Sequence, residues 1–348
     1  MSQFEWLQAV PATDFPSAPF WHPVEARLYW GEAASGKLFR LDPATGEAET
    51  LLDDGHPLGA IVMQADGSLL LFRDNGCVLA LRSGKPAGLV LAPVSDLRRT
   101  RFSCAAADAA GRVVCASLPS LHHPARLYLL DRGGRLSLLR EIPGIPSGMA
   151  FADDGGALLL SNSYATCPAT LKFAYDPGSD APLADSPSVL YDCLRETPRP
   201  RGAPAGIAMA ADGSILVARV GGGAILRHVP AGDRLATHAI QVRRPVGLCF
   251  GGGDLRDLYV TTAGAHRLVL DGAHSGEVAV IRGYQVPGAP LFVSRIGLSD
   301  DATFPPPAPP PPAPEGGEAT PSPPSTPPPP PCSGDSQISS GASPEASE

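Results

Sequence analysis

The sequence predicts an all-β protein, a six-bladed β-propeller followed by a disordered, proline-rich C-terminal tail. Three observations lead to this prediction. A phrase made of a Pro or Gly opening, a short apolar run, an Asp-Gly turn and a second apolar run recurs along the chain. The turn glycines of these phrases are regularly spaced. The apolar runs are short and bounded by Gly, Pro and Asp, as strands are, and helical spacing is scarcely visible.

The recurring phrase occurs in three close copies and two looser ones. The close copies are Pro57–Leu71, Pro146–Leu160 and Pro204–Val217, and the looser ones are Phe102–Cys115 and Pro245–Val260. Steps of 44, 44 and 58 residues separate the turn glycines, which are Gly67, Gly111, Gly155 and Gly213. A four-stranded propeller blade has this length, with one insertion in the longer step.

The first blade fits the same pattern. Phe20–Pro23 and Arg27–Trp30 read as its first two strands, Lys37–Asp42 as the third, and Pro43–Gly46 as the turn to the fourth. Six such units fit within residues 15–298, and residues 1–14 are expected to complete the last blade. Closing the ring removes exposed sheet edges. A pair of β-sandwiches is the alternative, but its strands would not come in near-identical sets of four.

The C-terminal segment, residues 299–348, has a different composition. From Asp301 onward it holds 17 of the 40 prolines, six acidic residues and no Lys or Arg. Such a sequence favours extended polyproline conformation and offers little to bury, which predicts disorder. Runs such as Pro306–Pro314 also fit the ligands of SH3, WW or EVH1 domains. A docking tail therefore remains an alternative to a passive extension.

Charge and cysteine usage narrow the function classes. The net charge is −8, from 27 Lys+Arg against 35 Asp+Glu, so no nucleic-acid partner is expected. The N-terminus lacks a secretory pattern and no run is apolar enough to cross a membrane, so a cytoplasmic protein is expected. Its seven cysteines are widely separated without a CxxC pair, which predicts free thiols. A closed propeller of this kind is expected to be a monomer.

The phrases resemble the gluconolactonase and regucalcin family, also called the senescence marker protein family, over about residues 14 to 295. The resemblance rests on several segments taken jointly and in order: Trp21–Trp30, Leu41–Gly46, Gly59–Ile61, Pro146–Ala150, Pro204–Ala208 and Phe250–Thr262. It implies a six-bladed propeller with a divalent cation at one end of the central channel. A Glu, an Asn and an Asp from three blades hold that cation, which polarises a lactone carbonyl, and the Asp can act as general base.

The positions that match these three ligands are Ser17, Ser147 and Ala205. Two hydroxyls and a methyl group provide no anionic ligand for a hard divalent ion. We therefore predict neither a metal ion nor another cofactor. Two nearby acids, Asp14 and Glu32, are not expected to replace the missing Glu, because Asp14 precedes the strand and Glu32 follows one.

The resemblance also indicates residues on the substrate side of the channel. The family phrase Arg-x-Asn-Asp-Gly matches Arg101–Ala105, where the arginine is retained, and an Asp-Ser phrase matches Asn162-Ser163. These positions suggest a small polar pocket with one cation. The candidate residues for the pocket are Ser17, Arg101, Ser103, Cys104, Ser147, Asn162 and Ala205.

Three functions follow as hypotheses. The first is a propeller that has lost the metal ligands of its family and binds a small molecule, such as a lactone or sugar acid, without catalysis or with divergent chemistry. The second is an active lactone or ester hydrolase with a rebuilt site. The third is an interaction scaffold that docks through the proline-rich tail. An active hydrolase is expected to bring at least two carboxylates together at the channel.

Overall fold

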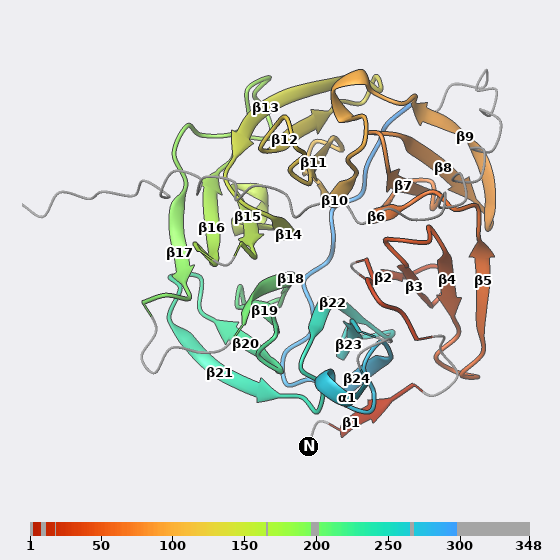
Figure 1. Ribbon diagram of the computed structural model, residues 1–348, viewed down its shortest axis with the longest axis vertical. Coiled ribbons are helices and arrows are strands. Elements are labelled where there is room, and N and C mark those ends of the chain that lie inside the picture. Colours follow the sequence, from red (N-terminus) through yellow and green to blue (C-terminus); the bar gives the residue numbers. More distant parts are fainter. Residues whose placement is uncertain are drawn as a thin grey trace, which may run out of the picture. The chain divides into compact units, whose positions relative to one another are not determined.

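The computed structural model describes residues 3–7, 12–17, 19–164, 166–195, 202–264 and 268–297. Within them the chain forms six four-stranded antiparallel sheets arranged as blades around a central axis (Figure 1). The prediction of an all-β, six-bladed propeller is confirmed. The predicted disorder of residues 299–348 lies outside the described residues.

In the first three blades, sequence order is spatial order from the axis outward. Blade 1 consists of β2 (Phe20–His22), β3 (Arg27–Gly31), β4 (Leu38–Leu41) and β5 (Ala48–Leu52). Blade 2 consists of β6 (Leu58–Met63), β7 (Leu69–Arg73), β8 (Val78–Arg82) and β9 (Lys85–Leu91). After the 3₁₀ turn η1 (Ser95–Leu97), blade 3 consists of β10 (Phe102–Ala107), β11 (Val113–Ser117), β12 (Ala125–Leu130) and β13 (Leu136–Ile142).

Blades 4 and 5 repeat this order, and blade 6 combines both ends of the described chain. Blade 4 consists of β14 (Pro146–Ala152), the turn η2 (Asp153–Gly155), β15 (Ala157–Asn162), β16 (Ala169–Ala174) and β17 (Ser188–Asp192). Blade 5 consists of β18 (Ala203–Met209), β19 (Ile215–Val220), β20 (Ala224–His228) and β21 (Arg234–Ala239). Blade 6 consists of β22 (Pro245–Gly251), β23 (Asp257–Thr262), the short helix α1 (Leu268–Asp271), β24 (Val278–Arg282) and β1 (Gln3–Trp6).

The ring is closed in blade 6, where the first strand of the chain pairs with the last one. β1 is the outermost strand of blade 6 and runs antiparallel to β24, with Gln3 opposite Arg282 and Trp6 opposite Ala279. At the neighbouring seam, the Trp21 ring of blade 1 stacks on Tyr259 of blade 6 at 5.8 Å. Because blade 6 needs β1 to be complete, loss of the N-terminal strand would expose the edge of β24.

Apolar side chains fill the spaces between adjacent blades. One buried cluster lies at each of the six contacts, from blades 1 and 2 around to blades 6 and 1. The first three strands of a blade therefore bury both faces, because one face packs on the preceding blade and the other on the following blade. This explains why the apolar runs of the first three strands of each blade are nearly continuous instead of alternating.

The innermost strands of blades 2 to 6 each carry a β-bulge near their start. The bulged positions are Gly59, Ser103, Ser147, Ala205 and Val246. A bulge inserts an extra residue and re-aims its side chain, so these residues leave the alternation of their strands. In blade 2 the bulge falls on the glycine of the repeated phrase, whereas in blades 4 to 6 it falls on the residue before that glycine.

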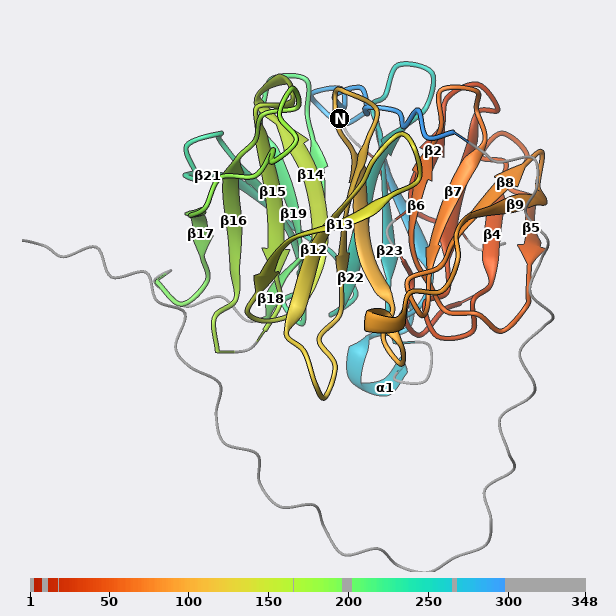
Figure 2. The same ribbon diagram turned by 90° about the horizontal axis from the view of Figure 1, so that it is seen from above.

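The last described segment, residues 285–297, forms a strap across one face of the propeller. In Figure 1 it crosses the central axis, and Figure 2 shows it on the face opposite α1. Its backbone bonds to the turns between the first two strands of several blades, for example Ala211 N to Pro287 O and Ser294 N to Met63 O, both at 2.8 Å. The Gln64 side chain donates to Ile296 O at 2.8 Å and fixes the far end of the strap.

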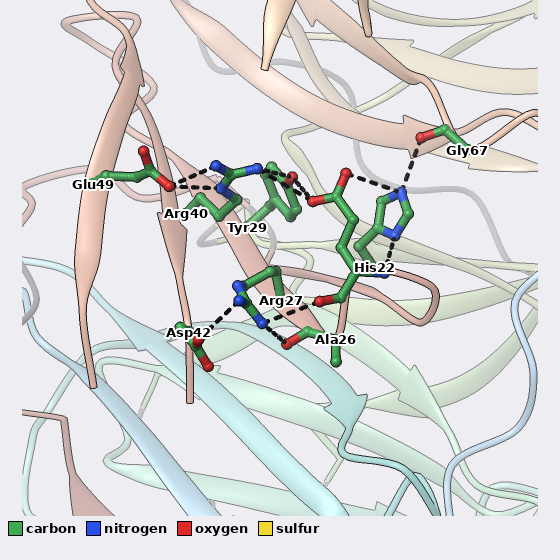
Figure 3. Close-up of polar contacts among 9 residues, drawn as sticks. His22, Ala26, Arg27, Tyr29, Arg40, Asp42, Glu49 and Gly67 are labelled. Atoms are coloured by element: carbon green, nitrogen blue, oxygen red, sulfur yellow. Dashed lines mark hydrogen bonds and ion pairs between the residues drawn. The ribbon is translucent and has the colours of Figure 1, made fainter. Parts of the chain in front are cut away.

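On the same face a polar network joins blade 1 to blade 2 (Figure 3). The buried His22 lies between two backbone groups: Glu25 N donates to its Nδ1 at 3.1 Å, so its Nε2 carries the proton and donates to Gly67 O at 2.9 Å. The Glu25 carboxylate accepts from the Tyr29 hydroxyl and from Arg40. Burial raises the pKa of Tyr29 to about 12, so the phenol remains a donor.

One buried histidine predicts how stability depends on pH. Burial lowers the pKa of His228, and nearby Arg219 lowers it further, although the hydrogen bond of Nδ1 with Gly232 O at 3.0 Å opposes the shift. In the unfolded chain the pKa of a histidine is about 6.5. The contribution of His228 to the free energy of unfolding is therefore fully present above that pH and is lost as the pH falls toward the lower pKa of the folded state. The melting temperature of the wild type should therefore decrease as the pH is lowered from 8 to 5. For His228→Phe the decrease over the same range should be less steep. An unchanged slope would contradict this role.

Two further sequence predictions concern cysteines and membranes. The cysteines within the described residues, Cys77, Cys104, Cys115, Cys167, Cys193 and Cys249, are all free thiols. No helix in the described part of the chain is long and apolar enough to span a membrane.

Candidate functional site

A pocket of about 200 Å³ lies at the end of the central axis opposite the strap. Its walls come from the segments that enter each first strand and leave each second strand. The entering segments include Phe15–Ser17, Arg101 and Arg244, and the leaving segments include Leu118, Ser163 and Ala263. All six blades contribute, so the propeller builds one site from residues far apart in the sequence.

The bulged residues form the inner ring of this pocket. Gly59, Ser103, Ser147, Ala205 and Val246 all line it, together with Ser17 of blade 1. At these ring positions hydroxyl groups therefore come from blades 1, 3 and 4, whereas Ala205 of blade 5 and Val246 of blade 6 are apolar. The pocket has a polar side and an apolar side.

A glycine after the bulge allows neighbouring blades to approach at the axis. A Cβ atom on Gly148 would lie 2.2 Å from the Ala205 carbonyl oxygen of the next blade. Such a distance is far below van der Waals contact, so a side chain at this position would push the backbones apart. The phrase Pro-x-Gly thus has two roles: its middle residue faces the pocket and its glycine permits the close contact.

The three serine hydroxyls of the ring differ in what they can offer a ligand. Ser103 donates to Ala116 O at 3.2 Å, and Ser147 donates to Pro204 O at 3.0 Å. Both therefore keep lone pairs free to accept from ligand hydroxyls. The buried Ser17 instead accepts from Gly31 N at 2.8 Å, so its own proton can be donated into the pocket.

Arg101 supplies positive charge to the polar side. Burial lowers the pKa of its guanidinium, while the carboxylate of Glu32 partly offsets that effect. The guanidinium makes no hydrogen bond or ion pair within the part of the chain that the structure describes. A mostly buried cation without such a partner is prepared to bind an anion or a polarised oxygen.

Arg244 is a second pocket cation, which sequence reasoning missed. It stands two residues before the bulged Val246, as Arg101 stands two residues before the bulged Ser103. Aligning the repeated phrases, with Phe102–Cys104 opposite Pro245–Gly247, would have found it. Its Nη1 lies 3.6 Å from Oδ2 of Asp271 in α1, and Asp271 is buried.

Two of the predicted pocket residues do not line it. Cys104 packs into the core between blades 3 and 4, because the bulge turns Ser103 toward the axis and returns Cys104 to the inter-blade face. Burial raises the pKa of this thiol to about 12, so it is not a nucleophile. Asn162 instead holds the backbone behind the pocket: its Oδ1 accepts from Ile145 N at 2.9 Å and its Nδ2 donates to Cys167 O at 3.1 Å.

Glu32 lies close to the pocket but does not line it. Its carboxylate accepts from the backbone amides of Asp14, Phe15 and Ala34, at distances from 3.0 to 3.2 Å. These bonds satisfy the charge and hold the segment that carries Ser17. The carboxylate is therefore a structural anchor.

The residues present do not fit a divalent metal ion. The side chains at the three positions that the resemblance assigns to ligands, Ser17, Ser147 and Ala205, meet at the pocket but supply no negative charge, and Arg101 adds a positive one. Among the described residues, no group of three His, Cys, Asp or Glu side chains is placed to hold a metal.

A second recess of about 220 Å³ lies beside β8 on the same face. Arg73 and Asp54, two charged residues of this recess, form a bidentate ion pair in which one hydrogen bond is 2.9 Å long. Arg73 also donates a hydrogen bond to the His56 carbonyl oxygen. The pair lowers the pKa of Asp54. Since these charges are already paired, the channel pocket is the stronger candidate site.

Comparisons with known proteins agree with this architecture. Residues 15–264 match the model of the SMP-30/Gluconolactonase/LRE-like region. Pentonolactonase XacC of Haloferax volcanii is 35% identical over 249 residues, covering 71% of this chain and 80% of the relative. A 6-deoxy-6-sulfogluconolactonase of Pseudomonas putida is 28% identical over 282 residues, covering 79% and 93%.

Solved structures show the same fold. Regucalcin from Agrobacterium tumefaciens superimposes with a TM-score of 0.73 at 19% identity, covering 85% of this chain and 98% of that one. The extent of the family match, the 35% identity to a curated relative and the shared propeller confirm the resemblance found in the sequence. The chain belongs to the SMP-30/gluconolactonase/regucalcin family.

Proposed function

We propose that this protein hydrolyses sugar lactones in the channel pocket, with Arg101 as the group that polarises the lactone carbonyl. The observation that carries the proposal is the Arg101 guanidinium, mostly buried and without a hydrogen bond in the described structure, on the hydroxyl-lined side of the pocket. Donors aimed at the oxygen where negative charge develops are a principal source of catalysis in acyl transfer.

The other pocket groups suit a polyhydroxylated ring. Ser103 and Ser147 present acceptors for ligand hydroxyls, and Ser17 presents a donor. The volume of about 200 Å³ is smaller than the pockets of drug-sized ligands, which hold roughly 300–1,000 Å³, and so indicates a ligand of monosaccharide size. Two relatives named as lactonases of sugar lactones support this choice.

The reaction adds one water molecule to the lactone. The water oxygen bonds to the carbonyl carbon and gives one proton to solvent water in the open pocket, while Arg101 stabilises the resulting oxyanion. The carbonyl then re-forms, the ring C–O bond breaks, and the ring oxygen takes a proton to become a hydroxyl. The hydroxy acid ionises at neutral pH, so one proton is released for each lactone opened. No step requires a metal ion at Ser17, Ser147 or Ala205.

The test follows proton release from pentono- and hexono-1,4-lactones, using enzyme dialysed against a chelator. We expect hydrolysis above the spontaneous rate, unchanged by chelation and by added Ca²⁺, Mg²⁺, Mn²⁺ or Zn²⁺. Activity that disappears on chelation and returns with one of these ions would contradict the arginine-based reaction.

A second candidate function is binding of sugar acids without turnover. It is favoured by the pocket lining, since no carboxylate within the described residues lines the pocket to act as general base. Aldonates that raise the melting temperature, together with no hydrolysis of any lactone, would support this candidate. A docking role for the tail would rest on residues outside those described.

A further inference from the structure

We propose that the channel pocket selects sugar lactones with a second, anionic group at the end remote from the lactone carbonyl, and that Arg244 binds that group. The inference rests on the proposed function and specifies its substrate class. It follows from where the two pocket arginines lie and from what surrounds each of them.

The two arginines enter the pocket from opposite walls. Arg101 precedes β10 of blade 3 and Arg244 precedes β22 of blade 6, and in a ring of six blades the third and sixth face each other. Figure 1 shows β10 and β22 on opposite sides of the axis. This arrangement suits a ligand that carries acceptor groups at two separated ends.

Asp271 positions Arg244 but leaves the N–H groups of the Arg244 guanidinium free of hydrogen bonds within the described residues. The carboxylate is 6% exposed, and its Oδ2 lies 3.6 Å from Nη1 but accepts no hydrogen bond within the described residues. The Arg244 guanidinium likewise makes no hydrogen bond there. The contact thus holds the guanidinium electrostatically and leaves its N–H groups available. Asp271 is a positioning residue, since it acts on the ligand through Arg244.

The balance of charge favours a second anion. Two arginines and no carboxylate are among the described residues that line the pocket. The polarised carbonyl of a neutral lactone needs one cation, which leaves Arg244, whose carboxylate partner Asp271 lies 3.6 Å away outside the pocket lining. The Arg244 side chain is 22% exposed and makes no hydrogen bond within the described residues, so its guanidinium can bind a carboxylate, sulfonate or phosphate through paired N–H groups.

The test uses two substrates that differ at one end. Glucono-1,4-lactone ends in a neutral hydroxymethyl group, and glucaro-1,4-lactone carries a carboxylate there. We expect kcat/KM to be about tenfold higher for the glucarolactone, because a charge-assisted contact at a partly buried site is worth roughly that factor. The lactone of 6-phosphogluconate extends the comparison to phosphate.

Three variants assign the preference to Arg244. Arg244→Gln is expected to lower kcat/KM about tenfold more for the glucarolactone than for the gluconolactone. Asp271→Asn should raise KM for the glucarolactone with a smaller effect on kcat, as expected of positioning. Arg243→Gln, at the exposed neighbouring position, is the matched control and should leave both substrates unchanged.

The possible outcomes separate this inference from the proposed function. Equal kcat/KM for both lactones, or equal losses in Arg244→Gln, would overturn the inference while the hydrolase remains. If neither lactone is hydrolysed, the proposed function fails, and calorimetry with gluconate and glucarate still decides the inference. Tighter binding of glucarate that disappears in Arg244→Gln would support it, and equal binding of the two acids would overturn it.

Discussion

Arg101→Gln is expected to lower kcat for lactone hydrolysis about 100-fold, a loss of roughly 2.7 kcal/mol of transition-state stabilisation. Gln keeps an amide donor at the site but removes the charge that balances the developing oxyanion. Arg101→Lys should retain part of the rate, since it keeps the charge without the planar guanidinium. Arg98→Gln, at an exposed position just before it in the chain, is the control and should keep the wild-type rate.

The same variant should not destabilise the fold. The Arg101 guanidinium makes no hydrogen bond in the described structure, and its burial disfavours the charged form. The melting temperature of Arg101→Gln should therefore equal or exceed that of the wild type, which identifies a residue kept for activity at some cost in stability. Full activity in Arg101→Gln, or a loss of activity that parallels a large fall in melting temperature, would contradict the proposed role.

Gly148→Ala is expected to destabilise the propeller by about 3 kcal/mol or more, or to prevent its folding. The new Cβ would lie 2.2 Å from the Ala205 carbonyl oxygen and 2.9 Å from Gly206 Cα, and both are backbone atoms that cannot rotate away. Because blades 4 and 5 meet here, relief requires the two innermost strands to separate.

The matched control is Gly253→Ala. This glycine is exposed, and no atom lies within 4 Å of the position that a Cβ would take. Its free energy of unfolding should change by no more than about 0.5 kcal/mol. Chemical denaturation of both variants measures the difference. Similar stabilities would show that the blades can move apart at the axis without cost.

The sequence was sufficient for the architecture because each blade repeats the same local chemistry. Short apolar runs and turn glycines such as Gly67, with its positive φ of 82°, determine strands and hairpins locally. The contacts between blades then follow from the repetition itself. A propeller is therefore more readable than a fold whose strands pair without a repeating unit.

The site was less readable, because strand alternation breaks at the bulges. Ser103 and Cys104 are adjacent polar candidates, and only the bulge decides that Ser103 faces the pocket while Cys104 enters the core. Arg244 was missed since the resemblance assigned no role to its position. The partnership with Asp271 could not be predicted, because α1 lies in an insertion with no counterpart in the other repeats.

The strap of residues 285–297 lies across one end of the propeller's central axis. It crosses the axis on the face opposite the pocket and is bonded to the turns of several blades. The strap thus lies across the end of the axis remote from the pocket, which favours entry and exit of a ligand at the pocket end. For a hydrolase built on this plan, the hydroxy acid formed has to depart before the next lactone can arrive. The cations that attract an acidic substrate also attract the acidic product, which slows its release.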